Sequence, residues 1–444
     1  MTEYPEKQPA IDEIWHSQFE KNGMVEAYEY LEGYKNHREE QKRLFLSGEV
    51  RNPILDYPRL DPDDLKGREE ALLSLKEEIL AKEENEIVGQ AYRWKINESV
   101  AKLRMLQASI SGDMRRFKRY SEFIYGKPSY EIFVFTVQSL RTKINEYRNS
   151  DNRPLSRAAR ELDEVLPQET ERAGFVSLPS EGTISLAERE TAKAIGDLVH
   201  LPEVEGELGV DEIKDIFQKA LDSLNLDEWE VVTDISGKPG ASVDQEEKKI
   251  KIPESKKLLF KEVQSLLVHE IGTHVARREK GERSRLRLLG PGLDRYERGE
   301  EGIATMRSQI VSGQIEDFSG LTGHLAISLA YGLDGKPRDF RDVYEIMQKY
   351  YFFDRLVKGK NIQKAKEEAQ RLAWNKGIRT FRGTDYTTPG VCFTKDIIYR
   401  EGNIGVWELI GKKPNEFRRI TVGKYDPTNP RHLYILDQLG ISES

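Results

Sequence analysis

The sequence is poor in several features that define common classes of protein. Its 444 residues include one cysteine, Cys392, which excludes an internal disulfide and a C-x-x-C metal site. No apolar run reaches the roughly 18 residues of a membrane span. The first residues, MTEYPEKQPAIDEIW, lack the basic and apolar segments of a secretory signal. We therefore expect a cytoplasmic protein that does not bind membranes.

An excess of basic charge is also absent. The chain has 69 Lys and Arg against 77 Asp and Glu, for a net charge of −8, and this argues against nucleic acid as the main ligand. Neither the Walker A pattern nor G-x-G-x-x-G occurs, so no phosphate-binding loop is indicated. Charged residues make up 33% of the chain, which is typical of helix-rich proteins.

Residue patterns divide the chain into four parts. Residues 1–49 are a charged helical N-terminal extension, and residues 50–228 form a helical scaffold whose apolar residues recur at helical intervals from about Gly67. Residues 229–434 form the expected catalytic core, and residues 435–444 a tail. We expect packed antiparallel helices in the scaffold rather than a coiled coil.

The core begins with strand signals. WEVVTDI (229–235) and KKIKIP (248–253) are expected strands on either side of a turn at GKPGAS (237–242). A helix is expected from about Lys256, and further helices at EEGIATMRSQIV, HLAISLAYGL and RDVYEIMQKYYFFDRLV. The fold class is therefore mainly α with a small β-sheet (α+β).

The first helix of the core ends in LLVHEIGTH, where His269 and His274 stand five residues apart. In a regular α-helix this spacing places the side chains about 140° apart, too far to hold one ion. A π-bulge near residues 271–273 would bring them together, and Gly272 makes such a distortion inexpensive. Thr273 can bond backwards to a carbonyl and assist it. The alternative is an ordinary helix end that carries two histidines.

A zinc ion that activates water needs three protein ligands and an open position. The third ligand is expected from GEEGIATM, where Glu301 opens an apolar helix. Glu300 competes for this role. The dipole of a helix N-terminus accounts for either acid by itself, so the glutamates indicate a metal only together with the histidines.

These motifs together resemble the microtubule-associated tyrosine carboxypeptidase family, whose bacterial relatives are labelled flavohaemoglobin expression-modulating QEGLP-motif proteins. The family's H-E-x-x-x-H matches His269, Glu270 and His274, and its Q-E-G-L-P corresponds to residues 300–304, EEGIA, which keep the Glu-Gly pair. FIYGKPS (123–129) and RTFRGTDYTTPGVCFTKDIIYREG (379–402) are also similar. The resemblance extends from about Asn52 to Tyr434.

The resemblance implies a zinc carboxypeptidase with a gluzincin-like core and a large helical N-terminal scaffold. It implies that His269, His274 and Glu301 bind zinc, and that the enzyme removes an aromatic C-terminal residue, tyrosine or phenylalanine, from a peptide or protein tail. Glu270 is then the general base that takes a proton from water and returns it to the leaving amine.

A carboxypeptidase also needs a cation for the free α-carboxylate of its substrate. Arg382 and Lys395 are the candidates, and Tyr399 could donate to the oxyanion or line an aromatic pocket. Each residue has an ordinary alternative role. Arg382 could brace a loop, Lys395 could cap a helix beside Asp396, and Tyr399 could belong to the core.

Three further residues invite functional interpretation. Cys392 is expected to be a small buried hydrophobe rather than a nucleophile. His324 is expected to be a core histidine or to orient a ligand. His200 carries no motif.

The segment between His274 and Glu301 is rich in arginine. Arg283, Arg285 and Arg287 either belong to a solvated connection or attract an acidic C-terminal tail such as that of tubulin.

Two other classes of function stay open. A non-catalytic regulatory module stabilised by metal would use the same ligands, although it would not need a base at Glu270. A helical scaffold protein accounts for residues 50–228 but leaves HEIGTH unexplained.

Overall fold

The computed structural model describes residues 7–442, apart from residues 24–25, 32, 58–59, 169–175, 196–205 and 237–239. Helices dominate these residues and strands are few and short, which confirms a mainly α fold with a small β-sheet. The gluzincin-like arrangement of the core stays a prediction. None of the described helices is both long and apolar enough to cross a membrane.

The N-terminal part of the chain is helical, as its apolar spacing predicts. The scaffold helix expected from Gly67 begins earlier, at Pro62, because Asp61 accepts a hydrogen bond from the N–H of Asp63 and proline suits the first helical position. The elements of this part are α1 (Glu13–Asn22), the 3₁₀ helix η1 (Ala27–Leu31), α2 (Lys35–Ser47), α3 (Pro62–Lys82), α4 (Glu86–Ser111), α5 (Met114–Tyr125), α6 (Tyr130–Tyr147), α7 (Arg153–Asp163) and α8 (Glu181–Ile195).

A three-stranded sheet lies beside the helix that carries the histidines. β2 (Glu230–Asp234) and β4 (Lys249–Pro253) are the two expected strands, and they pair in parallel, with Val231 opposite Ile250. β3 (Ser242–Asp244), which the sequence did not indicate, pairs antiparallel on the other side of β4. Ile250 and Ile252 are fully buried in one cluster with α9 (Val210–Ser223) and α10 (Phe260–His269). The first half of the expected turn, residues 237–239, lies outside the described residues, and Ser242 already belongs to β3.

The helix that carries the histidines starts later than expected. Leu258–Leu259 form a short strand, β5, that pairs with β1 (Glu207–Leu208), so α10 begins at Phe260 rather than near Lys256. The chain then continues through the π-helix η3 (Glu270–Val275), α11 (Ala276–Arg283), the 3₁₀ helix η4 (Arg287–Leu289) and α12 (Glu297–Ser312).

The C-terminal part of the chain is again helical. α12, α13 (Leu321–Tyr331) and α14 (Phe340–Val357) confirm the three helices expected there. The remaining elements are α15 (Ile362–Phe381), the 3₁₀ helix η5 (Thr394–Asp396), α16 (Ile397–Lys412), α17 (Pro414–Arg418), the 3₁₀ helix η6 (Arg419–Thr421) and α18 (Pro430–Gln438).

Buried apolar side chains form three clusters. One joins the sheet to α9, α10 and η3, and a second joins α8, α12, α16 and α17. The largest cluster joins the N-terminal helices to α13, α14, α15 and α18. Because η3 belongs to the first cluster and α12 to the second, the residues of HEIGTH and of EEGIA lie where two packed cores meet.

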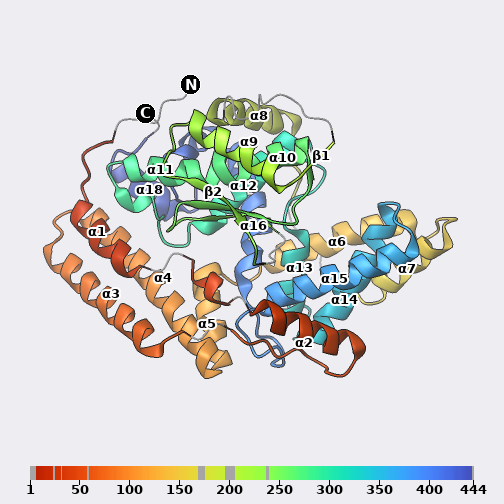
Figure 1. Cartoon of the computed structure of the whole chain (residues 1–444). Coiled ribbons are helices and arrows are strands. Elements are labelled where there is room, and N and C mark those ends of the chain that lie inside the picture. Colours follow the sequence, from red (N-terminus) through yellow and green to blue (C-terminus); the bar gives the residue numbers. More distant parts are fainter. Residues whose placement is uncertain are drawn as a thin grey trace.

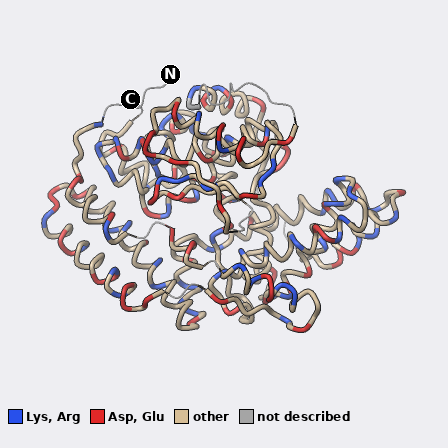
Figure 2. Tube along the Cα trace, viewed as in Figure 1, with Lys and Arg blue, Asp and Glu red and all other residues tan. Residues whose placement is uncertain are grey.

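The N-terminal helices dock at two separate places. Asp12, just before α1, accepts a hydrogen bond from Tyr92 of α4 at 2.8 Å. Phe45 of α2 packs instead against Phe340 of α14 and Trp374 of α15, with ring centroids 5.1 and 5.5 Å away. In Figure 1 α1 lies at the left and α2 at the bottom, right of centre, and η1 comes between them in the chain. Figure 2 shows acidic and basic residues interspersed over the described chain.

Candidate metal centre and substrate cleft

The helix that carries the two histidines widens into a π-turn where the sequence predicted a distortion. α10 ends at His269, and residues Glu270–Val275 form π-helix before α11 continues. The imidazole centroids of His269 and His274 lie 5.0 Å apart. The hydroxyl of Thr273 donates to the carbonyl of Val268, five residues back, at 3.1 Å. The predicted bulge and the backward bond of Thr273 are therefore both confirmed.

A buried arginine braces this turn from the neighbouring helix. Arg307 of α12 is 1% exposed, and its Nη1 donates to the carbonyl of Gly272 at 2.6 Å and to the hydroxyl of Thr273 at 3.3 Å. Burial and the nearby charge of Arg277 lower its pKa to about 10, so it keeps its charge at neutral pH. Sequence reasoning missed Arg307. Its only signal was a lone charge within the apolar stretch GIATMRSQIV.

The third predicted ligand joins the two histidines. One donor atom from each of His269, His274 and Glu301 lies within 4.8 Å of the other two. Nε2 of His269 and Oε2 of Glu301 are 3.6 Å apart, close to the roughly 3.3 Å edge of a tetrahedron of ligands around zinc. Oε2 of Glu301 is buried and has no hydrogen-bond partner among the described residues. The three side chains and this unpartnered oxygen fit a zinc ion.

Partner side chains hold both imidazole rings through Nδ1. The carboxylate of Glu300 lies 3.0 Å from His274 Nδ1, and the hydroxyl of Ser308 lies 3.3 Å from His269 Nδ1. Nε2 of each ring is thereby left for a cation. Glu300, the other candidate for the third ligand, contacts His274 and is not one of the three residues whose donor atoms lie together. Such outer partners orient metal-binding histidines in many proteins.

Glu300 is itself held by positive charges. Burial would raise its pKa, but Arg277, Lys424 and His274 lower it well below its usual range, so Glu300 is an anion. Arg277 forms an ion pair with it and donates to the backbone carbonyls of Ile420 and Tyr425 at 2.7 and 2.8 Å. The carboxylate behind His274 is therefore tied to residues 420–425, which no motif linked to the site.

The acidic surroundings also act on His269. Burial lowers its pKa, but contact with Glu301 and the charge of Glu270 outweigh this effect and raise the pKa to about 9. The pKa of Glu301 is lowered despite burial, because His269 and His274 face it. The group therefore favours a bound positive charge.

The glycine of the Glu-Gly pair sets the approach of two helices. A Cβ atom on Gly302 of α12 would lie 2.4 Å from the carbonyl oxygen of Gly402 of α16, and one on Gly402 would lie 2.0 Å from the carbonyl oxygen of Arg298. Only glycine permits this crossing. It places Glu301 on α12 beside the start of α16, from which Tyr399 projects.

All seven residues predicted for the site line one cleft of about 470 Å³. Glu270 opens the π-turn and is 5% exposed. Arg382 follows the end of α15, Lys395 lies in η5 and Tyr399 in α16. We call His269, His274 and Glu301 the ligand group, and Arg382 and Lys395 the cationic group.

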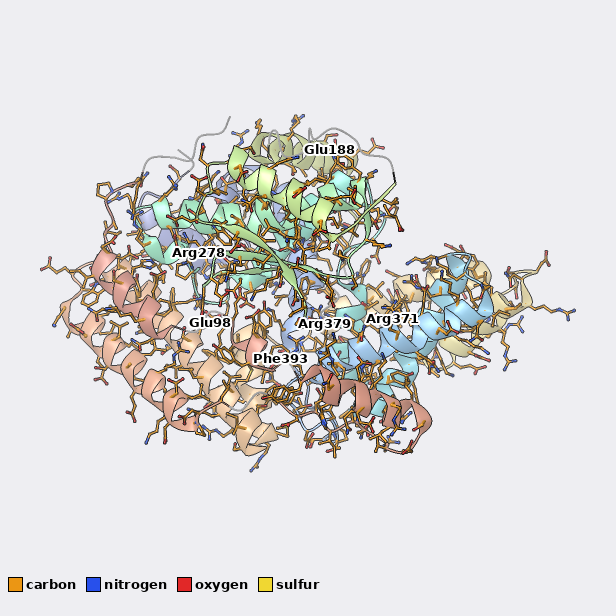
Figure 3. All side chains as sticks on the ribbon, in the orientation of Figure 1. Glu98, Glu188, Arg278, Arg371, Arg379 and Phe393 are labelled. Atoms are coloured by element: carbon orange, nitrogen blue, oxygen red, sulfur yellow. The ribbon has the colours of Figure 1, made fainter. Side chains whose placement is uncertain are left out.

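The cleft contains further residues that the sequence did not indicate. Arg371, Arg379 and Phe393 also line it, and Figure 3 shows them below the sheet. Arg379 pairs with Asp396 at 2.8 Å and lies 6.0 Å from the centroid of the Tyr399 ring. Asp396 thus pairs with Arg379 rather than with its neighbour Lys395. The sequence could not indicate this salt bridge, because Arg379 lies in α15 and Asp396 in the separate 3₁₀ turn η5.

Burial changes the acidity of the groups in the cleft. It lowers the pKa of Lys395, although Glu297 and Glu301 act in the opposite direction. Burial and the charge of Glu301 raise the pKa of Tyr399 well above its usual range, so the phenol stays protonated and can donate a hydrogen bond.

The hypothesis that Arg283, Arg285 and Arg287 attract an acidic tail is contradicted for Arg287. None of Arg283, Arg285 and Arg287 is among the described residues that line the cleft. Arg287 is 4% exposed and donates to the carbonyls of Glu282, Ser284 and Gln8. This arginine braces loops because its donors match nearby carbonyls, and it is not available to attract a tail.

The structure confirms the expectations for Cys392 and His324. Cys392 is 1% exposed, and burial raises the pKa of its thiol to about 12, which confirms a buried hydrophobe. His324 is fully buried between Glu401 and Ser328, at 3.2 and 3.3 Å, and is a core histidine. His200 lies outside the described residues.

Comparison with protein-family models identifies the class of protein. The model described as microtubule-associated tyrosine carboxypeptidase matches residues 181–444, more than half of the chain. The chain belongs to this family, whose name denotes a peptidase that acts at the C-terminus of a protein or peptide. The match begins later than the expected Asn52 and includes residues 435–444. A comparison with curated proteins finds no match.

Proposed function

We propose that the protein is a zinc-dependent carboxypeptidase that removes an aromatic C-terminal residue from a peptide or protein tail. One observation supports this most strongly. The ligand group, with donor atoms within 4.8 Å, shares its cleft with Glu270 and with the cationic group. A metal, a base and a binding site for a carboxylate are the parts that a metallocarboxypeptidase needs.

Two histidines and one glutamate suit zinc and leave a coordination position open to substrate. When bound, zinc would supply Lewis-acid polarisation of a water molecule and of the scissile carbonyl. The protein's part is to hold His269, His274 and Glu301 in place. Glu300 and Ser308 fix the two imidazole rings, and Arg307 fixes the turn between them.

Glu270 is the general base of the proposed reaction. It follows His269 directly and lines the cleft in a buried position. It takes a proton from the attacking water and passes it to the nitrogen of the leaving residue, whose bond to the carbonyl carbon then breaks. The products are a shortened chain with a new carboxylate and a free amino acid.

The remaining residues of the cleft position the substrate. Arg382 and Lys395 bind its α-carboxylate. Tyr399 donates its phenolic hydrogen to the carbonyl oxygen as negative charge develops there. The cleft is also lined by Tyr296 and Phe393, so an aromatic C-terminal side chain meets aromatic surroundings.

We further propose that the tail is acidic and that the protein acts in the cytoplasm, since a chain with a single cysteine suits a reducing compartment. Arg38 and Lys42, one turn apart on α2, and Arg371 on α15 line the same cleft. Cations in a cleft attract anionic ligands and raise their association rates. These residues replace Arg283, Arg285 and Arg287 as the candidates for contact with the tail.

The second candidate function is a non-catalytic module that metal stabilises. The same three ligands serve it. A structural zinc site is usually closed by four protein ligands. Among the described residues three side chains can hold the ion, and they face an open cleft beside the buried carboxylate of Glu270. This arrangement favours the enzyme.

One experiment separates the two functions. Metal content is measured on purified protein, and peptides that end in tyrosine, phenylalanine, leucine or lysine are followed by mass spectrometry, with wild type and Glu270→Gln side by side. The enzyme predicts one equivalent of zinc in both proteins and loss of a C-terminal aromatic residue only with wild type. Zinc in both proteins without cleavage would establish the module instead.

A further inference from the structure

The N-terminal segment contributes side chains to the cleft although it lies outside the residues that the family model matches. Glu26, Tyr28 and Glu29 line the same cleft as the ligand group. The family match covers residues 181–444 and therefore does not account for them. They come from the stretch around η1, between α1 and α2.

The segment is anchored by the first and last residues of η1. Ala27 and Leu31 are 0% and 3% exposed and belong to the largest apolar cluster, while Tyr28 between them is half-buried and faces the cleft. Asp12 fixes the preceding helix, because its carboxylate accepts from the backbone N–H groups of Arg287 and Leu288 at 2.8 and 3.0 Å. Anchors on both sides of Tyr28 make the segment a fixed wall of the cleft.

Tyr28 lies directly against the cationic group. Nζ of Lys395 is 3.2 Å from the centroid of the Tyr28 ring, and Cζ of Arg382 is 5.9 Å from it. A cation over the face of an aromatic ring is attracted by the electrons of the ring. Among the described residues Lys395 has no hydrogen bond or ion pair. The ring thus holds the ammonium group while its N–H donors stay available for a ligand.

Room for a substrate remains with Tyr28 in this position. The cleft of about 470 Å³ includes Tyr28 as a lining residue, and ligand sites in proteins typically measure about 300–1,000 Å³. Tyr28 therefore borders the space for a C-terminal residue instead of filling it.

We propose that Tyr28 is a positioning residue for substrate recognition, whose ring holds Lys395 toward the α-carboxylate of the C-terminal residue. The proposal rests on the carboxypeptidase function proposed above. It assigns part of the substrate pocket to the N-terminal segment. The relevant property is the aromatic face, so phenylalanine can replace tyrosine, whereas an aliphatic residue cannot.

The test compares Tyr28→Leu and Tyr28→Phe in the full, zinc-loaded chain, with an acidic peptide that ends in tyrosine. We expect Tyr28→Leu to raise KM about tenfold and to leave kcat within about threefold, because the cation–π contact acts on binding. Tyr28→Phe should restore KM to within about twofold of wild type. Circular dichroism melting checks that each variant is folded.

Tyr30→Leu is the matched control, because Tyr30 belongs to the same 3₁₀ turn, is 36% exposed and does not line the cleft. It should leave KM unchanged. An equal effect of Tyr30→Leu and Tyr28→Leu would overturn the proposal. An unchanged KM in Tyr28→Leu would also overturn it, and a lowered KM would mean that Tyr28 blocks the cleft. A KM in Tyr28→Phe as high as that in Tyr28→Leu would overturn it as well.

A binding measurement separates this proposal from the proposed function. The probe is the same peptide with its last peptide bond reduced to a methylene-amine, titrated into each protein by calorimetry. If wild type cleaves no peptide, the carboxypeptidase function fails, and the binding data alone then decide on Tyr28. Roughly tenfold weaker binding in Tyr28→Leu than in wild type and Tyr28→Phe supports the positioning role. Equal binding, or no binding by wild type, overturns it.

Discussion

The ligand group and the cationic group of the cleft are assembled in different ways. His269 ends α10, His274 lies in the π-helix that follows it, and Glu301 lies in α12, the next long helix. The cationic group brings together the end of α15 and η5, and Tyr28 reaches it from the other end of the chain. The residues proposed for bond cleavage thus lie within one stretch of the chain, whereas those proposed to bind the substrate also depend on Tyr28 from the N-terminal segment.

Because of this difference, the two groups should be sensitive to different substitutions. The ligand group depends on a helix distortion and on a few buried partners, Arg307 among them. The cationic group depends on how the N-terminal segment, α15 and η5 pack together. Variants that act on one group should leave the other largely intact.

The largest expected effect is on the chemistry beside the ligand group. Glu270→Gln should lower kcat about 10³-fold, since a positioned base contributes on the order of 10²–10⁴. KM should change little and zinc should still bind, because Glu270 is not a ligand. Peptide cleavage and metal content measure the two properties. Loss of zinc together with activity would show that Glu270 holds the metal group in place instead.

The second largest expected effect is a loss of stability when the contact between α12 and α16 at Gly302 is disturbed. Gly302→Ala places a Cβ atom 2.4 Å from the carbonyl oxygen of Gly402. It should lower the free energy of unfolding by about 3 kcal/mol, as overpacking does. Guanidinium denaturation measures this change.

Gly67→Ala is the matched control for the crossing. Gly67 lies inside α3, and no atom comes within 4 Å of the added Cβ. Alanine there should raise the free energy of unfolding by up to about 1 kcal/mol, because it favours helix over glycine. A loss of stability as large as that of Gly302→Ala would argue against close packing as the cause.

The brace on the π-turn should affect metal binding more than stability. Arg307→Met removes the donors to Gly272 and Thr273, and we expect zinc affinity to fall about tenfold, as with other residues that support metal ligands. Competition with a chromophoric chelator measures the affinity. Arg298→Met is the control, because Arg298 is on the same helix but is 44% exposed and pairs with Glu401. Unchanged affinity in the Arg307 variant would mean that the turn holds its shape without the brace.

The smallest expected effect is a pH dependence on the side of the cationic group. Burial and the charge of Glu29 raise the pKa of Glu26 to about 8, although Lys395 and Lys424 act in the opposite direction and Asp244 adds to the rise. Glu26 is therefore mainly neutral at pH 7 and becomes negative above pH 8. That charge weakens binding of the substrate carboxylate, so KM should rise about threefold between pH 7 and 9.

Glu26→Gln isolates this effect. Its side chain stays neutral at every pH, so the ratio of wild-type to variant KM should rise through pH 8 while other titrating groups cancel. The raised pKa also means that wild type loses stability, relative to Glu26→Gln, as pH rises from the ordinary glutamate value through 8. Thermal melting at pH 6 and 9 checks this sign. A constant KM ratio would exclude Glu26 as the titrating group.

Much of the ligand group could be read from the sequence, because its chemistry is local. The i, i+5 spacing of His269 and His274 requires a distortion if both bind one ion, and Gly272 and Thr273 supply the means. The choice between Glu300 and Glu301 could not be made in this way. The structure separates the two because Arg277 and Lys424 form ion pairs with Glu300. Neither ion pair follows from the spacing of residues.

The fold shows the same division. Apolar periodicity predicted α12, α13, α14 and the strands β2 and β4, whereas the three-residue β3 has no pattern long enough to recognise. Arg283, Arg285 and Arg287 suggested a basic surface. The sequence does not indicate that Arg287 donates to carbonyl groups from two separate parts of the chain.

By itself the sequence indicated the family, the mainly α fold, the two histidines of the ligand group and the bulge between them. These depend on residue types at short separations, where helix geometry relates spacing to direction. Only the tertiary structure decided that Tyr28 lies against Lys395, that Arg307 braces the π-turn and that Gly302 crosses Gly402. Contacts between segments far apart in the chain follow from how all the cores pack together, and no local pattern encodes that packing.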